Sequence, residues 1–169
     1  MIVGIEQIRL VAFDVDGVLT DGTIACGEGV ESKRFSVRDG LAFHLLKAAG
    51  FKTMILSGRK SSSSRMKELQ VDFLLEGVQD KLSALRDLCD REGFEFREIC
   101  YCGDDLPDVA VIQQVGIGVA PADGVEQARQ AAVVVTVAPG GCGVAREVAE
   151  FLLKGQGKWE KTVAQYGIS

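Results

Sequence analysis

Two carboxylates, Asp14 and Asp16, directly follow a short apolar run of residues 8–13. A carboxylate can attack phosphorus and form an acyl phosphate that water then cleaves. Such a reaction needs a second group to handle protons. Because Asp16 stands two residues beyond Asp14, it is suitably near to protonate the leaving alkoxide and later to deprotonate the water. The pair therefore predicts a nucleophile at Asp14 and a general acid/base at Asp16.

A hydroxyl, a cation and a second acid cluster stand at comparable places further along the chain. Ser57 follows the apolar residues 53–56, Lys81 stands at the start of an expected helix, and Asp104 follows residues 98–102. A serine hydroxyl can donate to a phosphate oxygen, and a lysine can neutralise both a phosphoryl group and its nucleophile. We predict these roles for Ser57 and Lys81.

Asp14 and Asp104 are also the predicted ligands of a metal ion. Carboxylates that point into one site repel each other and stay ionised at neutral pH only when a cation compensates them. The expected donors are all oxygen atoms and include no histidine cluster, which favours magnesium over zinc. The sequence therefore predicts Mg²⁺ as cofactor.

Alternating apolar segments and amphipathic segments must position these side chains. The alternation predicts an α/β fold, a Rossmann-like parallel sheet with helices on both faces, in which ligands bind beyond the carboxyl ends of the strands. One helix is expected between a cap at Asp39 and a left-handed Gly50. The expected strands are residues 8–13, 53–56, 73–75, 98–102, 116–119 and 133–135, and the other helices are 61–69, 81–92, 107–114, 125–131 and 144–153.

Two segments stand outside this alternation. Residues 23–26 and 30–35 flank Gly27-Glu28-Gly29 and predict a β-hairpin that projects from the fold. The tail, residues 155–169, is polar apart from Trp159 and Tyr166, and we expect only a partner subunit to order it. No domain boundary is visible, so residues 1–169 are interpreted as a single domain.

Composition narrows the class of protein. A net charge of −5 over 169 residues argues against nucleic acid as the main partner, because binding to phosphate backbones needs a dense basic surface. The five cysteines form no CxxC pair and suit free thiols in a reducing compartment. Neither a secretory signal nor an apolar run long enough for a membrane span is present. We therefore expect a cytoplasmic protein that does not bind membranes.

The motifs together resemble the haloacid dehalogenase superfamily of phosphatases. The superfamily's four motifs match Asp14-x-Asp16, Ser57, Lys81 and the segment Gly103-Asp104-Asp105-x-x-Asp108, in that order. The likeness is greater still to the superfamily's cap-less sugar-acid phosphatases, which act on 3-deoxy-D-manno-octulosonate 8-phosphate in lipopolysaccharide synthesis. It extends over almost the whole chain, through segments 14–22, 37–40, 58–60, 103–106 and 143–148.

The resemblance implies further roles for single residues. Asp16 would add its backbone carbonyl to the metal ligands Asp14 and Asp104, and Asp105 and Asp108 would support this set. Arg59, with Gly58 beside it, would contact the sugar acid, because a guanidinium pairs bidentately with a carboxylate. The resemblance also implies a homotetramer, in which the hairpin replaces a cap domain and each active site is closed by a neighbour.

One loop departs from the family's pattern. Where family members often carry an arginine between glycines, this chain has Gly141-Cys142-Gly143. Cysteine cannot supply that charge, so either Arg146 or a tail residue compensates for it or the substrate preference differs.

Three alternatives remain open at this point. The first is a phosphatase for a nine-carbon nonulosonate 9-phosphate, although relatives of that kind tend to carry glutamate at the position of Arg59. The second is a receiver-like domain that accepts phosphate on aspartate, although a receiver has no acid two residues beyond its acceptor, as Asp16 stands beyond Asp14. The third is a catalytically silent domain kept for tetramer assembly, which the intact Asp14, Asp16, Lys81 and Asp104 argue against.

Overall fold

The computed structural model describes residues 4–27, 30–60 and 63–167 and contains a six-stranded sheet and a separate two-stranded hairpin. The strands are β1 (Leu10–Phe13), β2 (Ala25–Gly27), β3 (Val30–Ser32), β4 (Lys52–Ser57), β5 (Phe73–Glu76), β6 (Ile99–Cys102), β7 (Ile117–Ala120) and β8 (Val134–Val135). The helices are α1 (Val37–Ala48), α2 (Ser63–Leu69), α3 (Lys81–Glu92), α4 (Leu106–Gln114), α5 (Glu126–Ala131), α6 (Val144–Gly155) and α7 (Trp159–Val163).

All strand pairs in the large sheet are parallel, in the order β5-β4-β1-β6-β7-β8. The central strand β1 has no exposed side chain, as expected for a strand that is covered on both faces. The chain runs from β1 out to β4 and β5 and then returns to β6 on the other side of β1. This reversal beside β1 is the kind of place at which open α/β sheets bind ligands.

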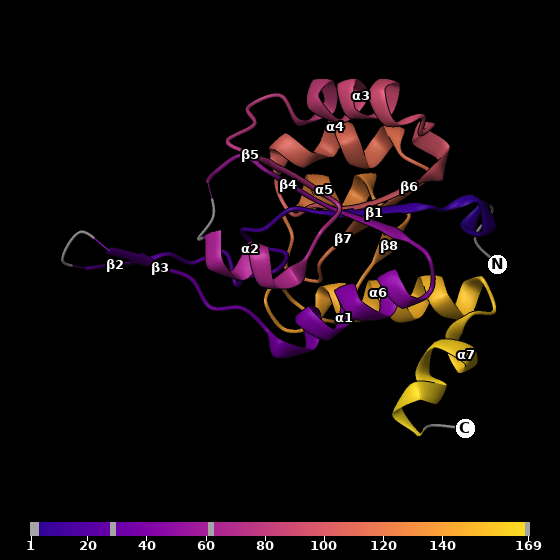
Figure 1. Ribbon diagram of the computed structural model, residues 1–169. Helices are drawn as coiled ribbons and strands as arrows, with labels where there is room; N and C mark the ends of the chain where they lie inside the picture. Colours follow the sequence, from indigo (N-terminus) through magenta and orange to yellow (C-terminus); the bar gives the residue numbers. More distant parts are fainter. Residues whose placement is uncertain (1–3, 28–29, 61–62, 168–169) are drawn as a thin grey trace.

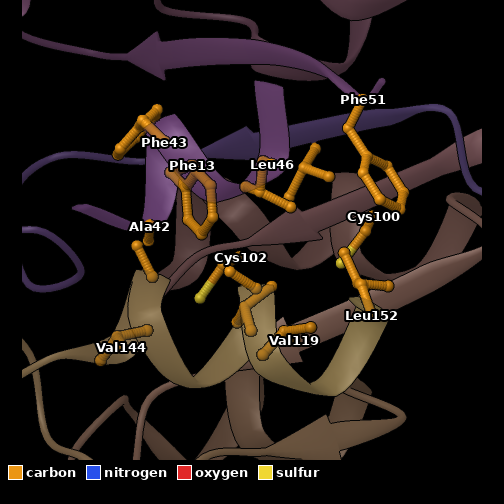
Figure 2. Close-up of a cluster of buried hydrophobic side chains, with 14 of the residues drawn as sticks. Phe13, Ala42, Phe43, Leu46, Phe51, Cys100, Cys102, Val119, Val144 and Leu152 are labelled. Carbon is orange, nitrogen blue, oxygen red and sulfur yellow. The ribbon is translucent and has the colours of Figure 1, made fainter. Parts of the chain in front are cut away.

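Helices cover both faces of the sheet (Figure 1). Side chains of β1, α1 and α6 form one buried apolar cluster, part of which is drawn in Figure 2, with Phe13 and Phe43 tilted against each other at 5.3 Å between ring centroids. A second cluster lies on the opposite face under α3, α4 and α5. The predicted α/β fold class is therefore confirmed.

The predicted strands and helices all exist, with most bounds shifted by one to three residues. A short 3-10 turn, Phe96–Glu98, replaces the start of one predicted strand. The first two residues of the predicted helix 61–69 lie outside the described residues, and so do residues 28–29 of the predicted hairpin turn. No helix in the described part of the chain is long and apolar enough to cross a membrane.

The predicted cap of α1 was wrong. Ser36, not Asp39, caps this helix, and its side chain accepts a hydrogen bond from the Arg38 backbone N–H. Asp39 is buried instead and accepts the backbone N–H of Arg146 at 3.0 Å, at the start of α6. A carboxylate there satisfies a donor that a helix N-terminus leaves free, so Asp39 joins two helices that are distant in sequence.

The prediction for the tail was also wrong. Residues after Lys154 form α7 and a 3-10 turn within the chain, and Thr162 and Val163 are buried. The Lys154 ammonium lies 5.0 Å from the ring centroid of Trp159, and the Lys158 ammonium lies 4.5 Å from that of Phe51. Sequence reasoning missed this packing because it treated the tail's two aromatic residues as isolated.

The loop before α6 crosses the loop after β1 at very short range. A Cβ atom on Gly140 would lie 2.2 Å from the backbone oxygen of Gly17, and the Gly141 N–H donates to the Val18 oxygen at 3.0 Å. We expect Gly140→Ala to lower the free energy of unfolding by about 1–3 kcal/mol, because neither backbone segment can give way cheaply. Urea unfolding measures this change. Gly157→Ala is the comparison, because its Cβ would meet no atom within 4 Å although its φ is +64°. It therefore reports strain at a left-handed residue without a steric clash.

Candidate active site

The polar strand ends meet around one cavity of about 480 Å³. This volume is within the range of small-molecule sites. The cavity's lining comes from the ends of β1, β4 and β6, the start of α3 and the base of the hairpin, through residues Asp14, Asp16, Gly22, Ile24, Ser57, Gly58, Arg59, Val78, Gln79, Lys81, Asp104, Asp105, Pro107 and Asp108.

Lys81 links two of the carboxylates. Its Nζ lies 3.0 Å from Asp14 Oδ1 and 2.6 Å from Asp108 Oδ1, and all three side chains are buried. Burial alone would lower the pKa of Lys81, but the two carboxylates outweigh it and raise that pKa. Lys81 therefore holds a fixed positive charge against the side chain of Asp14.

Asp108 is enclosed by donors on every side. Besides the contact with Lys81, its Oδ1 accepts the hydroxyl of Tyr101, and its Oδ2 accepts the backbone N–H groups of Asp104 at 3.0 Å and Asp105 at 3.2 Å. It stands at the third position of α4 and forms a capping box with Asp105. Its position thus fixes Lys81 and the Asp104 backbone at once.

The negative charges of Asp104 and Asp14 are not fully compensated by positive groups of the protein alone. The Oδ1 atom of Asp104 is buried and has no hydrogen-bond partner among the described residues. Burial and the neighbouring charge of Asp14 raise the pKa of Asp104 to about 7, and burial raises the pKa of Asp14 to about 6 despite Lys81. This electrostatic strain is what a bound cation would relieve.

The donor set fits a hard divalent cation. Carboxylate oxygens of Asp14, Asp104 and Asp108 lie within 4.8 Å of one another. Because both oxygens of Asp108 already have donors, Asp14 and Asp104 are the carboxylates that could hold the ion. Gly17 leaves space beside them, since its Cβ would lie 2.0 Å from Asp104 Oδ2.

We expect Asp104→Asn to stabilise the metal-free protein at pH 8. The pKa of Asp104 is 3.8 in the unfolded chain and about 7 in the native state. Ionising Asp104 therefore destabilises the native state increasingly as the pH rises from 3.8 to about 7, and an amide removes this effect. After allowance for partial exposure, the gain is about 1–2 kcal/mol. Thermal melts in EDTA at pH 5 and pH 8 should show a gain at pH 8 that shrinks at pH 5.

Asp87→Asn is the matched control, because Asp87 is an exposed carboxylate on α3 that does not line the cavity. A loss of stability for Asp104→Asn at pH 8 would contradict the view that this carboxylate is poorly compensated.

The end of β4 contributes the hydroxyl and a guanidinium. Ser57 is buried, and its Oγ accepts the backbone N–H of Arg59 at 3.3 Å, which turns the chain after the strand. Gly58 and Arg59 line the cavity, and Arg59 is exposed at its mouth. The structure therefore places Ser57 in the buried part of the site and Arg59 at its exposed edge.

Asp16 pairs with a residue of the hairpin. Lys33, directly after β3, has its Nζ 2.6 Å from Asp16 Oδ1, and only 4% of the Lys33 side chain is exposed. Asp16 also lines the cavity, so its carboxylate lies between the hairpin base and the site.

The structure does not bring Arg146 to this cavity. Its Nε pairs with Glu150 at 2.8 Å, and its guanidinium lies 5.6 Å from the centroid of the Trp159 ring. Within the chain, Arg146 instead packs along α6 and α7. Cys142 instead lines a shallow hollow beside Asp21 and Arg34.

Sequence reasoning missed Tyr101 and Lys33. Tyr101 is fully buried in β6, its hydroxyl donates to Asp108, and it lies 3.4 Å from Lys81 Nζ. A tyrosine in a central strand needs a partner for its hydroxyl, which could have indicated this role. Lys33 carried no local signal, since a lysine in a hairpin is ordinarily solvated.

This set of acids, lysine and serine at one edge of a parallel sheet defines a phosphoryl-transfer site, and the comparisons agree. The family model of the haloacid dehalogenase-like hydrolases matches residues 64–148. The chain belongs to this family.

Three relatives show what the chain is similar to. It is 39% identical over 163 residues, which is 95% of this chain and 87% of the relative, to 3-deoxy-D-manno-octulosonate 8-phosphate phosphatase KdsC of Escherichia coli K12. A second relative is the 3-deoxy-D-manno-octulosonate 8-phosphate phosphatase from Moraxella catarrhalis, whose crystal structure is a complex with magnesium, phosphate and KDO. It matches with a TM-score of 0.93 at 38% identity, and the match covers 96% of this chain and 95% of that chain. The crystal structure of the Yersinia pestis phosphatase for the same substrate matches with a TM-score of 0.89 at 37% identity, and the match covers 94% of this chain and 88% of that chain.

Proposed function

We propose that this chain hydrolyses 3-deoxy-D-manno-octulosonate 8-phosphate to the free sugar acid and phosphate, through a phosphoryl group carried on Asp14. The observation that supports this most strongly is the arrangement of Asp14, Lys81 and Asp104 in one cavity, together with relatives of that activity over nearly the whole chain.

In the first step, the Asp14 carboxylate attacks phosphorus as the bond between phosphorus and the sugar oxygen breaks. Asp16 gives its proton to that oxygen, so the sugar acid leaves as a neutral alcohol. Lys81 and the Ser57 hydroxyl stabilise the charge on the phosphoryl oxygens. Lys81 is held for this task by Asp108 at 2.6 Å.

In the second step, water attacks the phosphoryl group on Asp14. Asp16, now a carboxylate, takes the proton of the water, and the bond between Asp14 and phosphorus breaks to release phosphate. Each residue returns to its starting state, so one carboxylate serves as acid and then as base.

Magnesium is the proposed cofactor, held by Asp14, Asp104 and the backbone carbonyl of Asp16. When bound, it supplies positive charge that offsets the repulsion between the carboxylates and the charge of the phosphoryl group. The unpaired Asp104 Oδ1 atom fits this proposal.

Arg59 is the proposed contact for the carboxylate of the sugar acid. It is exposed at the mouth of the cavity, beyond the buried Ser57. We expect Arg59→Ala to raise KM for the sugar-acid phosphate on the order of 10- to 100-fold, because a charge-assisted bidentate contact is lost. Hydrolysis of p-nitrophenyl phosphate, which has no such carboxylate, should change little. An equal loss on both substrates would contradict this role.

Substrate preference is tested by turnover of the eight-carbon 8-phosphate beside a nine-carbon nonulosonate 9-phosphate. The proposal predicts a higher kcat/KM for the eight-carbon substrate. Turnover of the nine-carbon substrate alone would keep the mechanism and overturn the substrate, whereas no turnover of either would favour the silent-domain alternative.

The proposal includes a homotetramer in the cytoplasm that serves lipopolysaccharide synthesis. In support, the β2–β3 hairpin stands away from the sheet in Figure 1, and its strands pair with each other in a sheet of their own. Sedimentation of the native chain and of a chain without residues 23–35 tests this. A tetramer that persists without the hairpin would contradict the proposed contact.

A further inference from the structure

We propose that Lys33 is a positioning residue, which holds the carboxylate of Asp16 in place for its proton transfers. This inference rests on the proposed function. It assigns a second task to the hairpin, within its own chain: besides standing away from the fold, the hairpin supports the catalytic loop after β1.

The Lys33 ammonium is buried in an unusual way. Only 4% of the Lys33 side chain is exposed, and its Nζ lies 2.6 Å from Asp16 Oδ1. The buried Nζ has no hydrogen-bond partner beyond this ion pair among the described residues. Burying an ammonium without a counter-charge is unfavourable, so a buried lysine is kept next to its counter-charge. The pair is therefore fixed in geometry, unlike a solvated surface ion pair.

The neighbouring cation behaves differently. Arg34 pairs with Asp21 at 2.8 Å, but 89% of its side chain is exposed. Both pairs join the base of the hairpin to the loop after β1, yet only Lys33 reaches an acid that lines the cavity. Arg34 is thus a natural control for a purely structural tie between hairpin and loop.

The geometry assigns different tasks to the two oxygens of Asp16. Its Oδ1 is held by Lys33, 22% of its side chain remains exposed, and the residue lines the cavity. A carboxylate that is free to rotate would present either oxygen in many orientations. Fixing one oxygen leaves the other directed to the reacting groups, and misplacement of a catalytic group by about 1 Å can cost on the order of 100-fold in rate.

The test is a double-mutant cycle with p-nitrophenyl phosphate, because its hydrolysis needs no sugar-acid recognition but still needs Asp16 as a base. In the native background, Lys33→Met should lower kcat on the order of 10- to 100-fold with little change in KM. In an Asp16→Asn background, Lys33→Met should have no further effect, since it acts only through Asp16. Lys33→Arg should restore most of the native kcat.

Controls keep the inference falsifiable. Arg34→Met should leave kcat within about twofold, and circular dichroism should show that Lys33→Met is folded. Equal losses from Lys33→Met in both backgrounds, or failure of Lys33→Arg to restore activity in a folded protein, would overturn the positioning role. If the native chain hydrolyses p-nitrophenyl phosphate but not the sugar-acid phosphate, the proposed substrate fails while the cycle still decides the role of Lys33. A native chain inactive on both esters would overturn both.

Discussion

Asp14→Asn is expected to reduce phosphate release by on the order of 10⁴-fold or more, because an amide cannot form the covalent intermediate. The side chain is buried next to Lys81, and asparagine has the same shape, so the fold should persist. The measurement is phosphate release from the sugar-acid phosphate under saturating magnesium, with thermal melting as a check on folding.

Asp87→Asn provides the matched control, since Asp87 is an exposed carboxylate on α3 away from the cavity. Its activity should equal that of the native chain. A folded Asp14→Asn protein with more than about a tenth of native activity would contradict a nucleophilic role for Asp14.

Asp108→Ala is expected to lower the free energy of unfolding by about 3–5 kcal/mol, the usual cost of removing one partner from a buried ion pair. Alanine would leave the Lys81 ammonium with one carboxylate instead of two, and would leave the Tyr101 hydroxyl and two backbone N–H groups without their acceptor. For a chain of this length, the melting temperature should fall by about 10 °C or more.

The same change should also lower kcat, because Lys81 and the Asp104 backbone lose their common support. Asp108→Asn serves as the intermediate case: its amide oxygen can still accept a hydrogen bond, so its loss of stability should be smaller. If Asp108→Ala lowered the free energy of unfolding by less than about 1 kcal/mol, the donors around Asp108 would have found other acceptors. The role of Asp108 as their anchor would then be wrong.

The parallel sheet could be predicted because its signal is local. Continuous apolar runs such as residues 10–13 and 99–102 are typical of strands covered on both faces, and each is followed by turn residues and acids. The site could be predicted to the same extent, since the carboxyl ends of parallel strands share one edge. Asp14, Ser57, Lys81 and Asp104 do line one cavity, as this reasoning requires.

The rest depends on contacts between residues distant in sequence. Asp39 was expected to cap its own helix, but a carboxylate can satisfy any free N–H within reach, and here the donor belongs to Arg146. The tail was expected to need a partner, but aromatic and cationic side chains order it against α1 and α6. Lys33 was missed because its burial arises only from its contact with Asp16, which the local sequence does not indicate.

The most direct test is to trap the phosphoryl group on the protein. Asp16→Asn should still be phosphorylated by p-nitrophenyl phosphate, whose good leaving group needs no acid, but should lose the base that activates water. Acid quenching after reaction with ester labelled in its phosphoryl group, followed by proteolysis, should place the label on the peptide that contains Asp14. Release of labelled phosphate with no labelled peptide would show direct attack by water and contradict the mechanism.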